Sequence, residues 1–169
     1  MITLLEPCKQ DEIIFISTMQ NSRDFHFPFI KAPATSEEFQ TYLSKSKLET
    51  EKYYIAWNSQ HKIIGVFNIS GIFHGVFKSA FLGYYASAEY AGKGLMSQTM
   101  KLVLNEIFRS LDLHRIEANI QPANTASIYL ATRNSFLKEG FSPRYLKING
   151  IWQDHFRFAL TIEDWLASK

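Results

Sequence analysis

Cysteine is nearly absent from this chain of 169 residues, which contains a single one, Cys8. One cysteine excludes an intrachain disulfide and a zinc site built from cysteines. No stretch approaches the length of a membrane span, and no basic segment precedes an apolar run near the N-terminus, as a signal peptide requires. The net charge of +2 provides no excess positive charge for non-specific binding to nucleic acid. We therefore expect a cytoplasmic protein that binds neither a membrane nor nucleic acid directly.

The sequence also lacks internal repeats, low-complexity segments and linkers, so we expect a single domain over residues 1–169. Its composition, 46% hydrophobic and 20% charged, is that of a globular protein with a sizeable core. Hydrophobic periodicity predicts mixed α and β structure. Strands are expected near residues 2–5, 53–57, 62–69, 78–86, 114–121, 143–148 and 151–160, and helices near residues 10–21, 35–47, 94–111 and 124–138.

A glycine-bearing loop before the longest predicted helix is the most informative part of the sequence. An apolar strand, Phe81–Tyr85, leads into a loop with Gly92 and Gly94, and this loop opens the amphipathic helix. Backbone N–H groups at a helix start suit an anion such as a pyrophosphate, and glycine lets a ligand approach the backbone. Leu95 and Ser97 break the P-loop and dinucleotide motifs, respectively. The loop by itself therefore predicts either a phosphate site or a tight turn between strand and helix.

The second half of the chain has three local signals. Residues 114–121 alternate regularly between apolar and polar side chains, which predicts a strand with one buried face. Asn124 or Thr125 can cap the following helix, and Gly140 is a suitable stop for it. Asn149-Gly150 between two apolar runs is the strongest short signal for a β-hairpin.

Together these segments resemble the GNAT acetyltransferase superfamily over nearly the whole chain. That superfamily carries the signature Gln/Arg-x-x-Gly-x-Gly/Ala, and residues 89–94 match its two glycines, with Glu89 at the first position. The resemblance implies a three-layer α/β (α+β) fold whose mixed, mostly antiparallel sheet is flanked by helices. It also implies acetyl-CoA as co-substrate, no metal, and a monomer or a homodimer. Four segments narrow the resemblance to the RimJ/RimL type, the ribosomal-protein alanine and serine N-acetyltransferases: residues 114–119, 124–127, 138–141 and 149–155.

The resemblance assigns a set of residues to acetyl-CoA. In the superfamily the backbone amides of the glycine loop hold the pyrophosphate of the co-substrate. The set covers the strand before the loop, the loop, the start of the long helix and the Asn-x-x-Ser segment. Its members are Leu82, Tyr84, Gly92, Lys93, Gly94, Leu95, Met96, Asn124 and Ser127.

Glu117 and Ser127 are the candidate catalytic residues. Acetyl transfer to an amine needs a base for the amine proton and a donor for the leaving thiolate. Glu117 is the first candidate for the base, because burial raises the pKa of a carboxylate toward useful values; a solvated pair with Arg115 is the alternative. Ser127 corresponds to a serine near the CoA sulfur in related enzymes, and helix capping is the alternative for it. Many GNAT enzymes use a tyrosine acid at the position that Ala131 occupies.

The acceptor is expected between the aromatic segment 24–29, where a proline predicts a loop, and the last hairpin. The resemblance assigns His26, Phe27, Trp152 and Asp154 to this site. Packing in the core is the alternative for the aromatic residues. Asp154 is also the second candidate for the base.

Three functions fit these residues. The first is acetylation of a protein N-terminal α-amine, with the N-terminus of a ribosomal protein as a possible partner. The second is acetylation of a small amine, such as a polyamine, an amino acid, an aminoacyl-nucleotide or an antibiotic. The third is a non-catalytic module that binds acyl-CoA. The first is preferred because the segments with Glu117, Ser127 and Trp152 resemble N-terminal acetyltransferases. Amine chemistry supports an α-amine over a lysine side chain, because roughly a tenth of α-amines, with a pKa near 8, are neutral at pH 7, against well under a hundredth of lysine side chains. The same chemistry equally allows amino acids and aminoacyl-nucleotides.

Overall fold

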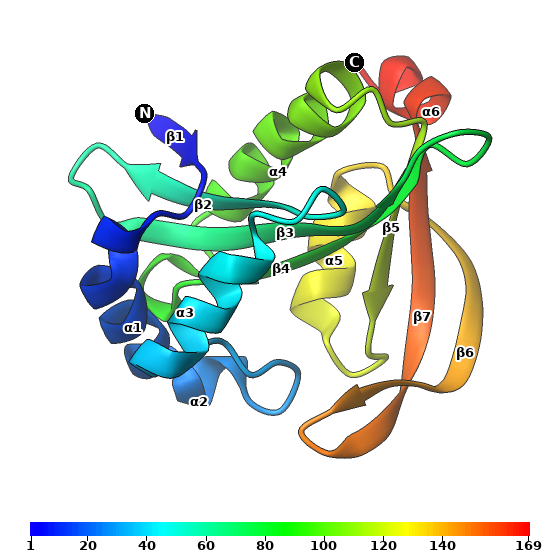
Figure 1. Cartoon of the computed structure of the whole chain (residues 1–169). Coiled ribbons are helices and arrows are strands. Elements are labelled where there is room, and N and C mark those ends of the chain that lie inside the picture. The colour runs from blue at the N-terminus through cyan, green and yellow to red at the C-terminus, as the bar shows by residue number, and fades with distance from the viewer.

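The computed structural model describes residues 1–169 and contains one seven-stranded sheet with the strand order β1-β2-β3-β4-β5-β7-β6. Neighbouring strands are antiparallel except β4 and β5, and helices lie on both sides of the sheet (Figure 1), which confirms the predicted fold. The strands are β1 (Ile2–Leu5), β2 (Lys52–Asn58), β3 (Ile63–Phe73), β4 (Ser79–Ala86), β5 (Arg115–Ile120), β6 (Leu137–Ile148) and β7 (Ile151–Thr161). The longer helices are α1 (Glu12–Asn21), α3 (Ser36–Lys45), α4 (Leu95–Asn105) and α5 (Thr125–Arg133). Shorter helical segments are η1 (Lys9–Asp11), α2 (Arg23–His26), η2 (Ala88–Tyr90), η3 (Glu106–Ser110) and α6 (Ile162–Ala167).

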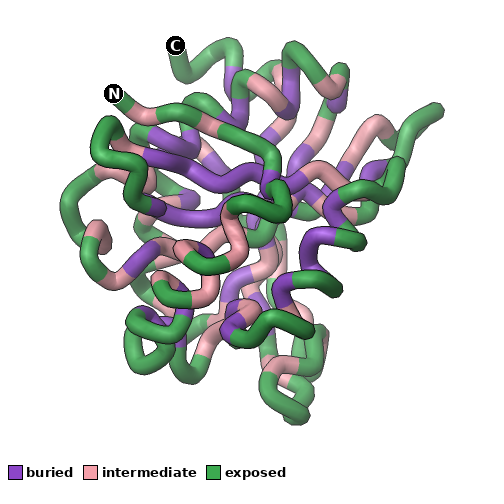
Figure 2. The backbone as a smooth tube through the Cα atoms, turned by 60° about the vertical axis from the view of Figure 1, so that its left-hand side comes forward, coloured by how far each residue is buried: buried purple, intermediate pink, exposed green.

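The first arm of the sheet, strands β1–β4, contains the two strands that are most deeply buried. β2 and β3 are nearly continuous hydrophobic runs, because different helices cover their two faces. One face packs against α1 and α3 in a cluster that includes Phe15, Phe39 and Trp57. The other face packs against α4 in a larger cluster that includes Phe67 and Met100. The buried segments, purple in the backbone tube of Figure 2, accordingly lie mostly in the interior of the molecule.

The second arm, strands β5, β7 and β6, is much less buried. Along β5 buried and half-buried residues alternate, which confirms the pattern predicted for residues 114–121. Ile116 and Ile120 belong to the same cluster as Ala131 of α5, whereas Glu117 lies on the opposite, polar face. The hairpin between β6 and β7 turns at Asn149-Gly150 as predicted, and both residues have positive φ angles, 49° and 82°.

The two arms separate where β4 and β5 meet. These parallel strands are paired only from Ser79↔Arg115 to Phe81↔Glu117. Beyond these pairs β4 continues to Ala86 and β5 to Ile120, but the two strands no longer pair with each other. The sheet therefore opens toward the carboxyl ends of β4 and β5, where the glycine loop and α5 begin.

The helix after Asn124 ends earlier than predicted. It stops at Arg133, because the Asn134 side chain donates a hydrogen bond to a carbonyl of the last turn at 2.8 Å and Ser135 adopts a left-handed φ of 69°. The following residues, including Gly140, pair with β7 instead of extending the helix. The prediction of a helix to residue 138 with Gly140 as its stop was thus wrong, since pairing in the sheet outweighs local helix periodicity.

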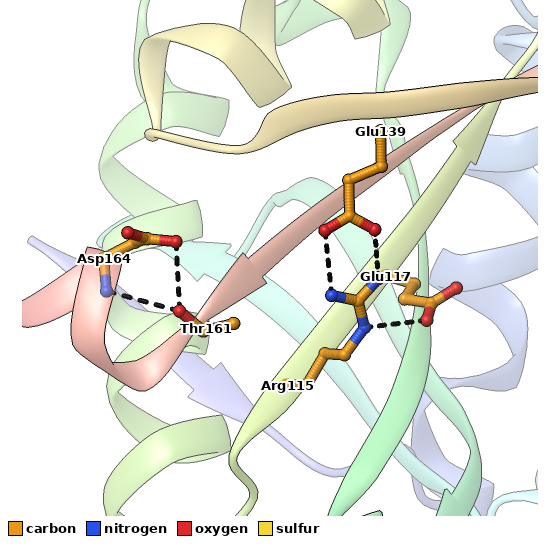
Figure 3. Close-up of polar contacts among 5 residues, drawn as sticks. All are labelled: Arg115, Glu117, Glu139, Thr161 and Asp164. Carbon is orange, nitrogen blue, oxygen red and sulfur yellow. Dashed lines mark hydrogen bonds and ion pairs between the residues drawn. The ribbon is translucent and has the colours of Figure 1, made fainter.

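Two short helices lie where the sequence predicted none. α2 places a helical turn inside the predicted aromatic loop and brings His26 to β4. α6 follows β7 directly, and the Thr161 hydroxyl caps it by accepting a hydrogen bond from the Asp164 N–H at 3.4 Å (Figure 3). None of the helices has the length and apolar character needed to cross a membrane.

Candidate active site

A cavity of about 400 Å³ lies where the two arms separate. Four segments line it: the aromatic segment after α1 (25–30), the end of β4 (84–86), the glycine loop with the first turn of α4 (91–97), and α5 with its cap (124–133). Eleven of its eighteen lining residues are hydrophobic. Segments far apart in the sequence therefore form one mostly apolar cavity with a small number of polar groups.

The glycine loop has the conformation that its sequence requires. Gly92 and Gly94 have φ angles of 71° and 76°, and a Cβ atom added at either would meet no atom within 4 Å. Gly94 caps α4, whose first turn contains no acidic residue. Unpaired N–H groups and the positive end of the helix dipole thus border the cavity, as an anion site requires. Met96 also lines the cavity, whereas Lys93 and Leu95 do not.

Glu89, the residue that departs from the superfamily signature, is turned away from this cavity. It is exposed, and it lines a separate, smaller cavity of about 240 Å³ together with Asn21 and Lys62. Its negative charge therefore does not border the candidate anion site at the glycine loop.

Ser127 and Tyr84 form a pair of hydroxyl groups in the wall of the cavity. The Ser127 hydroxyl donates to the Tyr84 oxygen at 3.0 Å, and the Tyr84 hydroxyl donates to the Ser127 carbonyl at 3.1 Å. Burial raises the pKa of Tyr84 to about 12, so the phenol stays protonated near neutral pH. Asn124, not Ser127, caps α5, because its side chain accepts from the Ser127 N–H at 3.2 Å. Ala131, at the position of the missing tyrosine, is buried in the core.

Residues 25–30, which include most of the aromatic segment 24–29, line the cavity and contact both arms. His26 contacts the first arm, with its Nε2 2.8 Å from the Ala86 carbonyl oxygen. On the second arm, Gln121 Nε2 donates to the Phe29 carbonyl at 3.2 Å, and Asn149 Nδ2 donates to that of Pro28 at 3.3 Å. The segment is therefore held at both sides of the opening between β4 and β5.

Glu117 lies outside the lining of the cavity. Its carboxylate accepts a hydrogen bond from Arg115 Nε at 2.9 Å (Figure 3), which is the ion pair that the sequence offered as the alternative. The same guanidinium binds Glu139 of β6 through both terminal nitrogens. These hydrogen bonds raise the pKa of Arg115, and the hydrogen bond from Arg115 lowers that of Glu139. The Glu117 carboxylate is thus paired with the Arg115 guanidinium, and Glu117 does not line the cavity.

The remaining predicted site residues also lie outside the lining. Leu82 is buried in the larger core cluster. Phe27 and Trp152 are exposed on the surface, at 69% and 57%. Asp154 accepts a hydrogen bond from the Arg144 N–H at 2.8 Å within the last hairpin. Of the proposed acceptor residues, only His26 lines the cavity, and roles for the others stay predictions.

Arg133 is a lining residue that sequence reasoning missed. It follows Ala126 and Leu130, which also line the cavity, at the spacing of one helical face, and this periodicity could have identified it. Its Nη1 donates to the Tyr129 hydroxyl at 2.9 Å. No aspartate, glutamate or lysine lines the cavity, so Arg133 is its one permanently charged side chain. No group of three or more His, Cys, Asp or Glu side chains is placed to hold a metal ion.

Comparison with known sequences gives consistent matches. The acetyltransferase (GNAT) domain model matches residues 2–136. The probable N-acetyltransferase YjcK of Bacillus subtilis is 35% identical over 127 residues, which cover 75% of this chain and 69% of that protein. The [ribosomal protein uS5]-alanine N-acetyltransferase of Escherichia coli is 41% identical over 110 residues, which cover 65% of this chain and 57% of that enzyme. The chain therefore matches little more than half of the length of the E. coli enzyme.

A comparison with solved structures supports the fold over almost the whole chain. RimJ of Mycobacterium smegmatis, solved in complex with CoA-disulfide, superposes with a TM-score of 0.88 at 24% identity. The superposition covers 96% of this chain and 83% of the other. At this level of identity the likeness shows a shared fold.

Proposed function

The chain belongs to the acetyltransferase (GNAT) family, and we propose that it transfers the acetyl group of acetyl-CoA to the N-terminal α-amine of a protein. A ribosomal protein is the first candidate acceptor, which is supported by the 41% identity to an enzyme that acetylates one. The observation that carries the choice of acceptor is the composition of the cavity, which is mostly apolar and has no carboxylate.

The residues that line the cavity offer groups suited to parts of acetyl-CoA. Gly92, Gly94 and the first turn of α4 would hold the pyrophosphate through backbone N–H groups, and Arg133 supplies a positive charge for an anionic co-substrate. The apolar walls suit the arm that connects the nucleotide to the thioester. The hydroxyl pair of Ser127 and Tyr84 would lie at the thioester end, where the leaving sulfur needs a proton.

The reaction needs little from the protein beyond these groups. A neutral amine attacks the thioester carbonyl carbon, and much of the rate comes from holding the two reactants together. Protonation of the departing thiolate by a hydroxyl contributes further. The pKa of Tyr84 is about 12, so its phenol is protonated throughout the neutral pH range. The Ser127–Tyr84 pair can therefore donate a proton in that range.

The missing carboxylates favour an α-amine over a polyamine. A polyamine carries several positive charges, and burying such charges without partners is costly. The cavity offers them no negative group. A single α-amine, neutral in roughly a tenth of molecules at pH 7, needs no such counter-charge. Lysine side chains fit less well, because well under a hundredth are neutral at that pH.

A thiol-release assay with acetyl-CoA tests this function. The acceptors are a peptide with a free N-terminal alanine, the same peptide with a blocked N-terminus and one internal lysine, a free amino acid and spermidine. We expect thiol release with the free peptide only, with mass spectrometry locating the acetyl group on its α-nitrogen.

Other outcomes would replace this proposal by a specific alternative. Labelling of lysine Nζ alone would contradict it, and labelling of the small amines alone would make the protein a small-molecule acetyltransferase. Binding of CoA, measured by calorimetry, without turnover on any acceptor would make it a non-catalytic acyl-CoA-binding module.

A further inference from the structure

We propose that the ring of Phe29 limits the size of the acceptor's first side chain, so that the protein prefers peptides that begin with a small residue. The inference rests on the proposed acetyl transfer and adds a specificity-determining residue to it. It assigns to Phe29 the place that the resemblance gave to Phe27, two residues earlier in the chain.

The first argument is the distribution of chemical groups among the four segments that line the cavity. Gly92 and Gly94 at the start of α4 form the part suited to the pyrophosphate. The hydroxyl pair of Ser127 and Tyr84, from α5 and β4, forms the part suited to the leaving sulfur. Only the segment 25–30 has no part in either group. Under the proposed function this segment is therefore the wall left for the acceptor residue.

Within this segment, Phe29 is the aromatic residue whose burial fits such a wall. Phe25 is 48% exposed, and Phe27 is 69% exposed and does not line the cavity. Phe29 lines the cavity and is half-buried. It belongs to neither hydrophobic core cluster and is not packed against either, whereas Ile30 packs against the smaller one. The Phe29 ring is thus partly buried without being part of the core.

Hydrogen bonds fix the backbone that carries this ring. The Phe29 N–H donates to the His26 carbonyl at 3.0 Å, and the Phe29 carbonyl accepts from Gln121 Nε2 at 3.2 Å. The preceding carbonyl, that of Pro28, accepts from Asn149 Nδ2 at 3.3 Å, at the turn between β6 and β7 (Figure 1). Moving the ring aside for a larger substrate would break these bonds to the second arm. A wall that is fixed before binding discriminates between substrates by size.

The space in the cavity favours a small first residue. The cavity measures about 400 Å³, and it also has to hold the acetyl group and part of the arm that connects this group to the nucleotide. Alanine, serine and glycine add at most two heavy atoms beyond the backbone of the peptide. Leucine and phenylalanine add four and seven, and these atoms would meet the Phe29 ring.

The variant Phe29→Ala tests the proposal, because it removes the ring and keeps the backbone groups that form the hydrogen bonds. The acceptors are two peptides that differ only in the first residue, alanine or leucine, and the measured quantity is the ratio of their kcat/KM values. We expect the wild type to prefer the alanine peptide by about tenfold or more, since one methylene group alone changes such a ratio by about 10–200-fold. In Phe29→Ala this preference should fall by about tenfold or more.

Two other phenylalanine variants make the test specific. Phe77→Ala, at a residue 65% exposed in the turn between β3 and β4 and outside the lining, is the control and should keep the wild-type ratio. Phe27→Ala tests the rival assignment in the same segment. A ratio that changed in Phe27→Ala and not in Phe29→Ala would return the role to Phe27 and overturn the proposal.

A purely structural role of Phe29 would give a different result. Loss of stability in the segment would lower kcat/KM for both peptides alike and leave their ratio unchanged, which would overturn the proposal. If Phe29→Ala does not fold, as judged by circular dichroism, Phe29→Leu decides instead, because leucine is smaller than phenylalanine and keeps an apolar side chain. Its ratio should move in the same direction, and an unchanged ratio would again overturn the proposal.

Failure of this inference is distinguishable from failure of the proposed function. A wild type that acetylates the alanine peptide, with the same ratio in Phe29→Ala, would overturn the role of Phe29 alone. A wild type that accepts the leucine peptide as readily as the alanine peptide would do the same. A wild type that releases no thiol with any peptide would overturn both proposals.

Discussion

The two arms of the sheet belong to one continuous set of strands but are packed in different ways. In β3 of the first arm the first five residues are all buried, whereas β6 of the second arm has no buried residue. The helical cluster around α1 and α3 contains no residue of the second arm. A strand is therefore hydrophobic along its whole length only where helices cover both faces. The second arm keeps one polar face, and the candidate active-site cavity lies where the two kinds of packing meet.

This comparison also explains why a polar strand face is an ambiguous sign of catalysis. The polar face of β5 satisfies its own charges, because Arg115 binds both Glu117 and Glu139. The polar groups that line the cavity come instead from the ends of elements: His26 from α2, Tyr84 from β4 and Ser127 from α5. In this protein the charged side chains in the middle of β5 pair with one another, and the polar groups that line the cavity come from other elements.

The largest effect is expected from a direct test of the difference in packing. Phe67→Ala in β3 removes a fully buried ring and should lower the free energy of unfolding by about 3–5 kcal/mol. Phe141→Ala in β6 removes a ring that is 49% exposed and packs on Phe156, and should cost only about 1 kcal/mol. Urea denaturation followed by circular dichroism measures both. Equal losses would show that the arms do not differ in packing energy.

A smaller effect is expected at Ser127, which lines the cavity from α5, the helix that follows β5 of the second arm. Ser127→Ala removes the hydroxyl that contacts Tyr84 and should lower kcat by about 10²-fold. The melting temperature should change little, because the Asn124 cap binds the backbone N–H of residue 127, which the variant retains. Thr125→Ala, exposed in the same helical turn and outside the lining, is the control. A lower melting temperature with unchanged kcat would assign Ser127 to the stability of α5.

The smallest effect is expected at the glycine loop, which follows β4 of the first arm and lines the cavity. Gly94→Asp should raise the dissociation constant of CoA at least about tenfold, or about 1.4 kcal/mol, because it adds negative charge at the anion site. Gly150→Asp is a matched control, since Gly150 also has a positive φ and free space around it but lies in the last hairpin. Both substitutions place a side chain at a residue with a left-handed φ angle, 76° for Gly94 and 82° for Gly150. Calorimetry that found equal CoA binding in the two variants would therefore remove the loop from the site.

Local chemistry determined much of the fold from the sequence alone. The Asn149-Gly150 turn, the conformation of Gly92 and Gly94, and the alternation along β5 follow from backbone freedom and periodicity within a few residues. The local pattern singled out the glycine loop as a phosphate site or a tight turn, and the resemblance to the GNAT superfamily joined it with Ser127 in one candidate site. The end of α5 could not be predicted in this way, because it depends on the pairing of β6 with β7.

The tertiary structure decided which polar groups meet. Tyr84 and Ser127 are 43 residues apart, and His26 and Ala86 are 60 residues apart, so no local pattern relates them. Each contact exists because β4 and β5 separate after three paired residues and the segment that contains His26 bridges the opening. The same geometry leaves Glu117 at the last pair of the parallel ladder, bound to Arg115. The sequence by itself determined most of the elements and the chemistry they carry, because these depend on local patterns. Only the separation of the two arms decided which side chains face the cavity.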